Sequence, residues 1–376
     1  MTYDAIVLGL GGMGSAAAYH LAARGARVLG LEQFPLVHRR GSSHGHTRII
    51  RTAYYEHPAY VPLVRRSFTL WAEMEAQLGR NLLTPLPCLS LGPPDSELIR
   101  GVEQAATEHQ LDVERLSANE LRRRYPQFHM PTDMTGVLEQ SAGALFVEEC
   151  VRAHLDTAAA TGRADLRAEE PAVSWASHPT HVEVTTARGT YTAAHLVVTA
   201  GAWATALLAD LGVPLRVMRQ VQHWFTPADI AAFGPDRFPV FIADTPAGAF
   251  YGLPSLAGQG LKLAGHYAAP ELMSPDAVSW DVSDTDSDSA VAFLRDYLPS
   301  AASRPVRSEV CMYTLSPDRH FVIDHHPHHP RVSVACGFSG HGFKFSPVVG
   351  EILADLALTG TTNHPISLFR STRFHP

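Results

Sequence analysis

The sequence predicts an α/β protein of two domains, one built around a parallel sheet and the other around a mostly antiparallel sheet. Three observations predict this fold class. The chain has 376 residues, which is more than one average domain needs. Its first residues follow the order strand, glycine-rich turn, helix, strand. Residues 215–267, in contrast, are dominated by short strand patterns that Pro and Gly separate.

The first parallel unit carries a nucleotide-binding pattern. Residues 3–8 form an apolar, β-branched run that leads into Gly-x-Gly-x-x-Gly at residues 9–14, then a helix over residues 15–23 and a strand over residues 26–31. The glycines allow a tight turn and the close approach of a pyrophosphate to the helix N-terminus. Glu32 follows at the distance where an acid binds ribose hydroxyls. This order predicts a Rossmann-type dinucleotide-binding domain, for either NAD or FAD.

The segments after Glu32 favour FAD. A nicotinamide enzyme would continue with regular βα units, but residues 33–46 are irregular and rich in Gly, Ser and His. A later strand over residues 191–199 runs into Gly201 and Trp203. Such a chain leaves the nucleotide domain and returns to it, as two-domain flavoproteins do.

The remaining elements complete the two domains. Helices are expected over residues 58–78 and 147–160, after a capping box formed by Ser117 and Glu120, and after Ser346 as N-cap with Pro at the next position. Two strands are expected within residues 182–199, around a turn at residues 188–189. We assign residues 1–82, 147–214 and 318–376 to an FAD-binding domain. Residues 83–146 and 215–317 are assigned to a substrate domain with a mostly antiparallel sheet.

Composition limits the partners and the location. A net charge of −7 argues against binding to nucleic acid or to a membrane surface, because such proteins carry a basic field. No run approaches the ~20 apolar residues that cross a bilayer. The start of the chain lacks the features of a signal peptide, and the four widely spaced cysteines suit a reducing compartment. We therefore expect a cytoplasmic protein with free thiols.

The His-rich run from His325 to His329 is the one sequence feature that suggests a metal. Its proline and the lack of thiol or acid partners favour an exposed turn instead. We therefore expect no metal site.

The lysines are unusual, because Lys262 and Lys344 are the only two among 30 basic residues. Lys262 stands in an apolar run and Lys344 in a Gly-rich loop that leads into the last helix. The pKa of an ammonium shifts readily on burial, whereas a guanidinium stays charged. These two lysines are therefore candidates for a chemical role that an arginine would fill poorly. A helix N-terminus beside Lys344 also suits an anion. Chance placement of the two lysines is the alternative.

Strand alternation groups several polar residues. In the strand over residues 260–267, Lys262 and His266 share one face with a small residue between them, which leaves room for a planar ligand. Cys311 and Tyr313 share a face in the strand that ends at residue 314. A salt-bridged buried lysine and a core cysteine are the alternatives. Together the segments predict a basic, aromatic pocket that contains Arg48, Arg51, Lys262, His266 and Lys344.

With these residues the chain resembles the family of monomeric sarcosine oxidase and N-methyltryptophan oxidase, in which FAD is covalently held. The resemblance extends over nearly the whole chain and rests on five segments. These are Gly9 to Glu32; Ser43 to Arg51; Tyr251 with Gly260 to His266; Cys311 to Asp318 with Phe321 to Asp324; and Gly337 to Lys344.

The resemblance implies roles for individual residues. Arg51 and Lys344 would hold the substrate carboxylate, and Lys262 would lie on the face of the flavin where oxygen is reduced. Cys311 would form a thioether to the flavin 8α carbon. The residues near the substrate amine would be His266, Tyr251 and Tyr313, with Ile242 in the pocket wall, and those close to the flavin ring would be Arg48 and His44.

The resemblance also implies one FAD per chain, held by the glycine motif and several loops. The implied cofactor-binding residues are Gly9, Gly11, Gly12, Met13, Gly14, Glu32, Ser42, Thr47, Arg48, Gly201, Trp203, Cys311, Phe338, Gly340, His341, Gly342, Phe343 and Lys344.

Three positions depart from the family pattern. His46 stands where the family usually has an acid, and Ser43 stands where it has a second His. Ile242 stands where sarcosine oxidases place a flexible Met above the substrate. The first change alters the charge expected near the flavin or the substrate, and the third affects the shape of the pocket.

The predicted function is an FAD-dependent oxidase of N-methyl or other small secondary α-amino acids. It would oxidise the amine to an imine and reduce oxygen to hydrogen peroxide, with formaldehyde released from N-methyl substrates. The partners would be the amino acid and oxygen, and the chain would be a monomer. The alternatives are a dehydrogenase of the same fold that uses another electron acceptor, and a nucleotide-binding protein without oxidase activity. The sequence does not select among sarcosine, N-methyltryptophan, pipecolate and other imino acids.

Overall fold

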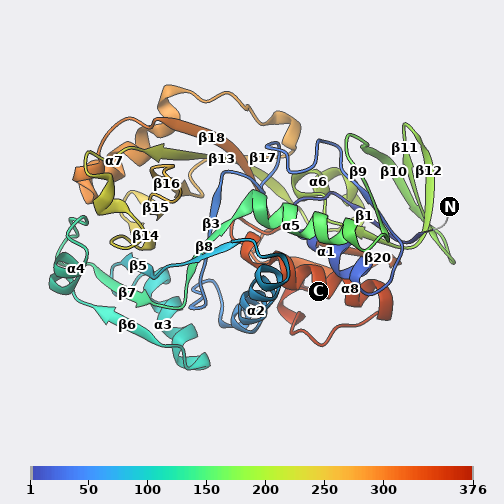
Figure 1. Cartoon of the computed structure of the whole chain (residues 1–376), viewed down its shortest axis with the longest axis horizontal. Coiled ribbons are helices and arrows are strands. Elements are labelled where there is room, and N and C mark those ends of the chain that lie inside the picture. Colours follow the sequence, from blue (N-terminus) through green and yellow to red (C-terminus); the bar gives the residue numbers. More distant parts are fainter. Residues whose placement is uncertain (1–2, 375–376) are drawn as a thin grey trace.

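Two large sheets organise the computed structural model, and they lie at opposite ends of the longest axis (Figure 1). The structure describes residues 3–374. Residues 1–2 and 375–376, which the sequence analysis assigns to the FAD-binding domain, lie outside the described residues. The mixed α/β architecture predicted from the sequence is confirmed.

The eight-stranded sheet has the order β10-β11-β12-β1-β2-β9, with β20 paired to β12 and β19 paired to β20. Its centre is parallel, because β1 pairs in parallel with β2 and β12, and β12 pairs in parallel with β20. Its strands are β1 (Tyr3–Leu8), β2 (Val28–Leu31), β9 (Ala164–Arg167), β10 (Ala172–Ser177), β11 (Val182–Thr186), β12 (Gly189–Val198), β19 (Val322–His326) and β20 (His329–Cys336).

Helices bury the apolar side chains of this sheet. Alternate residues of β1 face two different cores: Ala5 and Val7 pack with helices α1, α5 and α8, whereas Ile6 and Leu8 pack beside α6. This burial on both faces explains why the strand reads as a continuous apolar run. The helices are α1 (Gly12–Ala23), α2 (Val61–Leu78), α5 (Val147–Ala160), α6 (Ala204–Leu207) and α8 (Ser346–Thr359).

The nine-stranded sheet has the order β17-β13-β16-β15-β14-β5-β7-β6, with β18 also paired to β13. It is antiparallel except where β14 runs parallel to β5. Its strands are β5 (Cys88–Gly92), β6 (Val113–Leu116), β7 (Thr135–Glu139), β13 (Arg216–Phe225), β14 (Val240–Thr245), β15 (Gly248–Leu253), β16 (Leu261–His266), β17 (Glu271–Leu272) and β18 (Arg307–Leu315).

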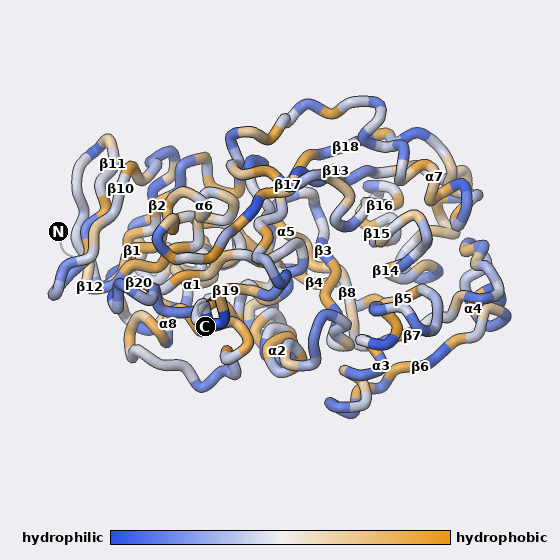
Figure 2. The backbone as a smooth tube through the Cα atoms, turned by 180° about the vertical axis from the view of Figure 1, so that it is seen from behind, coloured by the Kyte–Doolittle hydropathy of each residue, from blue (hydrophilic) through white to orange (hydrophobic). Residues whose placement is uncertain are grey.

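One face of the nine-stranded sheet is apolar and the other is polar. Phe225, Phe241, Phe250 and Leu263 form a core with α4 (Ala118–Arg124) and α7 (Asp288–Tyr297). The alternate residues point the opposite way and form the polar face described below. Figure 2 shows the hydrophobic stretches running through the interior of the molecule, with hydrophilic stretches in the outer loops. Helix α3 (Glu97–His109) packs on β5 and β7.

A small third sheet joins segments assigned to the two domains. Strands β3 (Thr47–Ile50) and β4 (Leu83–Pro85) both pair with β8 (Gly143–Phe146). These strands lie between the two large sheets in Figure 1.

Several predicted elements match closely. Strand β1 and helix α5 have the expected bounds, and Ser117 and Glu120 form the predicted capping box at α4. Two helix starts were wrong. Helix α1 begins at Gly12 because the glycine turn leads straight into it. Ser346 is not an N-cap, since the turn Phe343–Phe345 already leads into α8 and the Ser346 hydroxyl is buried without a partner among the described residues.

The prediction that the His325–His329 run lacks an acid partner was also wrong. His326 is buried, and its Nε2 lies 3.2 Å from Asp210 Oδ1. His329 Nε2 lies 3.1 Å from the other oxygen of the same carboxylate. Asp210 is distant in sequence, so the pattern around residue 325 gave no sign of it.

Within residues 3–374, none of the helices combines the length and the apolar character that a membrane crossing requires.

Candidate active site

A cavity of about 450 Å³ brings together most of the predicted site residues. Its lining comes from the glycine turn, the loop after β2, the polar face of the nine-stranded sheet and the Gly-rich loop before α8. The predicted residues in the lining are Gly9, Gly11, Gly12, Met13, Glu32, Ser42, Arg48, Arg51, Gly201, Trp203, Ile242, Tyr251, His266, Tyr313, Phe338, Gly340, His341, Gly342, Phe343 and Lys344.

The glycine turn is shaped to let another group approach the backbone. Gly9 has φ +86°, and a Cβ at Gly14 would collide with the Gly9 carbonyl oxygen, so helix α1 can start directly beside the strand. A Cβ at Gly12 would crowd Phe343 and Ser43 at 3.1 and 3.2 Å. Gly14 therefore supports the turn from behind rather than lining the cavity.

Glu32 and Ser43 hold this turn through hydrogen bonds. Leu10 N donates to Glu32 Oε2 at 2.8 Å, and Phe34 N donates to Glu32 Oε1 at 3.1 Å. Gly12 N donates to Ser43 Oγ at 3.0 Å. Ser43, one of the departures from the family pattern, thus satisfies a free N–H at the start of α1.

Two buried cations, Arg51 and Lys344, contribute to the same cavity. Arg51 Nη1 donates to Ala53 O at 2.7 Å, and Arg51 Nη2 donates to Glu56 Oε2 at 2.6 Å. Lys344 Nζ donates to His341 O at 2.6 Å and to Tyr54 Oη at 3.3 Å. Both side chains are more than nine-tenths buried.

The charges in this region are strongly perturbed. Burial, followed by repulsion from Arg51, lowers the pKa of Lys344 to about 7. Burial acts to raise the pKa of Glu56, but Arg51, with smaller contributions from His341 and Lys344, lowers it to about 2. Glu56 is therefore a carboxylate at neutral pH, and it balances one of the two arginines in the lining, Arg48 and Arg51.

The polar face of the nine-stranded sheet forms another wall. Ile242 pairs with Tyr251, which pairs with Ala264, so these residues lie side by side across β14, β15 and β16. His266 Nδ1 lies 3.1 Å from Tyr313 Oη. Burial lowers the pKa of His266 to about 3, which leaves its ring uncharged at neutral pH. This wall therefore offers aromatic and hydroxyl groups and no cation.

Lys262 lies beside the cavity on the same sheet face. Its Nζ donates to the carbonyl oxygens of Gly45 and Thr47, each at 2.8 Å, so it fixes the loop that leads into β3. Burial, followed by repulsion from Arg48, lowers the pKa of Lys262 well below its ordinary value. The neighbouring Arg48 donates to Gln222 Oε1 at 3.1 Å and to Ser42 O at 2.8 Å.

Cys311 is a buried thiol on the same face of strand β18 as Tyr313. Its register partner is Gln220 on β13. Burial raises the pKa of Cys311, while Arg48 and Lys262 oppose that effect. His44 is also buried, with its Nδ1 3.6 Å from Glu309 Oε2.

His46 lies in the loop before β3 and is half-buried. Its ring packs edge-on against Phe146, and its backbone N–H donates to the Glu148 carboxylate. Burial lowers the pKa of His46, so the ring adds little positive charge at neutral pH.

Sequence reasoning missed Glu56 and Gln222. Glu56 stands five residues after Arg51 in an irregular aromatic segment, where spacing predicts no contact. Gln222 could have been predicted more easily, because it lies two residues from both Gln220 and Trp224 on β13 and therefore points to the same side of the sheet.

The residues present fit a dinucleotide of the FAD type. The glycine turn lines the cavity at the start of α1, a position that suits a pyrophosphate. Within the described part of the chain, Gln222 Nε2 and His44 Nε2 are buried without a hydrogen-bond partner, whereas His44 Nδ1 faces the Glu309 carboxylate at 3.6 Å. Buried polar atoms normally have partners, so a ligand that reaches past the cavity lining to these two residues would satisfy an otherwise costly arrangement.

A family model and individual relatives identify the same class of proteins as similar to this chain. Residues 4–356 match the family model described as FAD dependent oxidoreductase (DAO). The chain is 48% identical to the monomeric sarcosine oxidase of Streptomyces avermitilis, over 99% of this chain and 98% of that protein. It is 36% identical to the N-methyl-L-tryptophan oxidase of Salmonella dublin over the full length of both.

Solved structures give the same result for the fold. NikD, described as an unusual amino acid oxidase essential for nikkomycin biosynthesis, superimposes with a TM-score of 0.86 and 28% identity, over 98% of this chain and 97% of that chain.

Proposed function

The chain belongs to the FAD-dependent oxidoreductase family, and from this premise we propose that it oxidises N-methyl or other small secondary α-amino acids with oxygen as the electron acceptor. One observation carries the proposal. A single cavity is lined both by the glycine turn suited to a dinucleotide and by two buried cations, Arg51 and Lys344, suited to a carboxylate. The names of the similar oxidases support the same class of substrate.

Arg51 and Lys344 bind the substrate carboxylate in this proposal. Arg51 already uses two of its N–H groups on Ala53 O and Glu56, which orients the remaining donors of its planar fork. Lys344 adds a point charge from the turn before α8. Together they fix one end of the amino acid, which places its amine for reaction.

The wall of Tyr251, His266 and Tyr313 surrounds the substrate amine. His266 is uncharged at neutral pH, so it does not repel an amine that carries a proton before binding. Ile242 lies next to Tyr251 in the sheet and limits the size of the group attached to the amino acid.

FAD, when bound, would accept a hydride from the C–H bond next to the amine nitrogen while the amine loses a proton, and would pass the two electrons, with two protons, to oxygen; the products would be hydrogen peroxide and an imine that water hydrolyses, with formaldehyde released from N-methyl substrates. The glycine turn and Glu32 would hold its adenosine half, and Arg48 and His44 would lie near its ring. Lys262, in its protonated form, would stabilise negative charge that develops on oxygen, because a buried cation interacts with such a charge more strongly than a cation in water does. Cys311 would hold the ring through a thioether.

Peroxide release tests this function. The purified protein should consume oxygen and release peroxide with at least one of sarcosine, N-methyltryptophan and pipecolate, and Arg51→Ala should mainly weaken apparent substrate affinity. In Lys262→Met, anaerobic reduction of the flavin should stay near the wild-type rate while reoxidation by oxygen slows.

Two results would contradict this assignment. Rapid reduction by an amino acid followed by slow reoxidation in the wild type would identify a dehydrogenase that uses another acceptor. A normal rate of flavin reoxidation in Lys262→Met would show that Lys262 does not assist the reduction of oxygen.

A further inference from the structure

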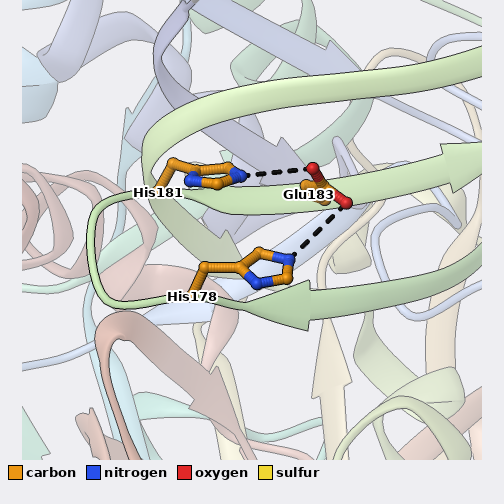
Figure 3. Close-up of side chains that lie close together, drawn as sticks. All are labelled: His178, His181 and Glu183. Atoms are coloured by element: carbon orange, nitrogen blue, oxygen red, sulfur yellow. Dashed lines mark hydrogen bonds and ion pairs between the residues drawn. The ribbon is translucent and has the colours of Figure 1, made fainter.

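A pair of histidines and a glutamate lie together at the end of the hairpin formed by β10 and β11, outside the cavity. His178 and His181 flank its two-residue turn, next to the register pair formed by Ser177 and Val182. Their rings stack with centroids 4.6 Å apart. Glu183 lies two residues after His181 and therefore on the same face of the strand. Figure 3 shows both rings directed at the Glu183 carboxylate.

We propose that His178, His181 and Glu183 bind a divalent transition metal, with Zn²⁺ as the fitting ion. The ligand atoms of all three residues lie within 4.8 Å of one another. His181 Nε2 lies 3.2 Å from Glu183 Oε1, and His178 Nε2 lies 3.5 Å from Glu183 Oε2. In tetrahedral Zn²⁺ sites, metal–ligand distances of 2.0–2.2 Å separate neighbouring ligand atoms by about 3.3 Å. The hairpin therefore holds a ring nitrogen on each side of the carboxylate near this spacing, and the two ring nitrogens lie within 4.8 Å of each other. The group is open to solvent, which can supply a fourth ligand.

The protonation of the rings is compatible with a metal. A metal on Nε2 requires the ring proton on Nδ1, and that N–H needs an acceptor. His181 Nδ1 lies 3.2 Å from Thr180 Oγ1, and a hydroxyl can accept as well as donate. His178 and His181 are both partly exposed, so exchange of the ring proton with water is unhindered.

The second His-rich group, formed by Asp210, His326 and His329, does not allow the ring proton of its buried histidine to lie on Nδ1. His326 faces Asp210 through Nε2, but the backbone N–H of His328 donates to His326 Nδ1 at 3.3 Å. A backbone N–H can only donate, so the proton of the neutral ring stays on Nε2 and points at Asp210. That group is a hydrogen-bonded brace between β19 and the segment that carries Asp210, and it provides a matched control.

The proposed site is separate from the proposed oxidase chemistry. The cavity lining extends along β10 to Val173, and five residues of extended strand separate Val173 from His178, which is about 17 Å. Metal binding is therefore expected to order the hairpin without changing turnover.

The test is a titration of the untagged, flavin-loaded protein with Zn²⁺ by isothermal calorimetry, since a polyhistidine tag would bind the same ion. We expect one equivalent, with affinity that falls in acid because protons compete for the ring nitrogens. His181→Gln and Glu183→Gln should each weaken binding more than about tenfold, and Thr180→Val by roughly tenfold. His329→Gln should bind like the wild type. Hydrogen exchange in residues 172–186 should slow on addition of Zn²⁺.

Two outcomes would overturn the proposal. The first is no stoichiometric Zn²⁺ binding by the wild type. The second is binding that survives His181→Gln but is lost in His329→Gln, which would assign the metal to the Asp210 group instead. All four variants change exposed or partly exposed side chains, and their folding is checked by the retained flavin spectrum.

Discussion

The two cations proposed to bind the substrate carboxylate, Arg51 and Lys344, differ in how firmly they keep their charge. The guanidinium of Arg51 stays protonated at any ordinary pH. Burial, followed by repulsion from Arg51, lowers the pKa of Lys344 to about 7. Glu56, with a pKa of about 2, stays ionised over the same range. The cavity therefore loses about one positive charge as the pH rises through 7.

This loss predicts a pH dependence of carboxylate binding. A small carboxylate that carries no amine should bind more weakly as the pH rises above about 7, by up to about tenfold per pH unit, because its partner Lys344 loses its proton. The sign follows from the lowered pKa, since the cation is present below it and lost above it. Lys344→Arg should remove the dependence.

Perturbation of the flavin spectrum measures this binding across the pH range. A dependence in Lys344→Arg equal to that of the wild type would show that another group titrates.

At the residue scale, sequence reasoning worked where a strand or a motif sets the direction of a side chain. Lys262 and His266 share a face because strand alternation requires it. The ion pair between Arg51 and Glu56 could not be predicted, because both residues lie where no regular element fixes their directions. Their separation in space depends on tertiary packing alone.

The backbone of the loop that precedes β3 is held by side chains from helix α5 and from strand β16. Gly45 and His46 have φ of +89° and +69°, which turn the chain sharply. The Glu148 carboxylate accepts from the N–H groups of both residues, and Lys262 donates to the Gly45 carbonyl oxygen. The loop is therefore held from a helix on one side and from a strand on the other.

Gly45→Ala should destabilise the protein more than an ordinary glycine replacement in a left-handed position. Alanine costs about 1–2 kcal/mol at positive φ. At Gly45 its Cβ would also approach Gln222 Oε1 at 2.6 Å and displace that side chain. Gly258→Ala is the control, because Gly258 has φ +73° and open space around it.

Thermal unfolding midpoints of the two variants measure the difference. Equal midpoints would show that Gln222 moves aside without cost.

At the element scale, the composition of a segment predicted helices and strands better than their first residues. Helix α5 and the capping box at α4 follow from local signals. The start of α8 did not, because Ser346 followed by Pro has the pattern of a cap, whereas Phe343–Phe345 already turn helically. Packing of Phe345 into the core decides that geometry.

Across the whole molecule, the proposed flavin site draws on both large sheets. The glycine turn follows β1 of the eight-stranded sheet, whereas Cys311 lies on β18 of the nine-stranded sheet. A thioether at Cys311 would therefore attach the cofactor to one sheet while the other binds its pyrophosphate.

Cys311→Ser tests this arrangement. Acid precipitation should leave the yellow colour with wild-type protein, whereas flavin should pass into the supernatant from Cys311→Ser, because no covalent bond then holds it. Before precipitation the variant should still bind FAD through the glycine turn. Cys336→Ser is the matched control, since Cys336 is also a buried free thiol and itself lines the cavity. Colour lost from the wild type, or kept by Cys311→Ser, would contradict the assignment.

The overall fold class could be predicted because the glycine motif and the strand pattern are local. The order of the strands could not. Strand β13 pairs with β16, β17 and β18, and β14 pairs with β5 from a distant segment. The division into two discontinuous domains stays a prediction, since β3, β4 and β8 join segments assigned to both.

The close packing of α1 on α8 has a consequence for biosynthesis. A Cβ at Gly350 would lie 2.5 Å from the Ala16 backbone, so the two helices touch nearly backbone to backbone. Strand β1 also lacks one of its two neighbouring strands until β12 has been translated, since Ala5 pairs with His195. A ribosome adds residues from the N-terminus, so the glycine turn emerges first and Glu32 and Ser43 follow soon after, but α8 can pack against α1 only when residue 350 has left the exit tunnel. The proposed flavin site thus begins with some of the first segments to be translated and is among the last parts of the protein to be completed.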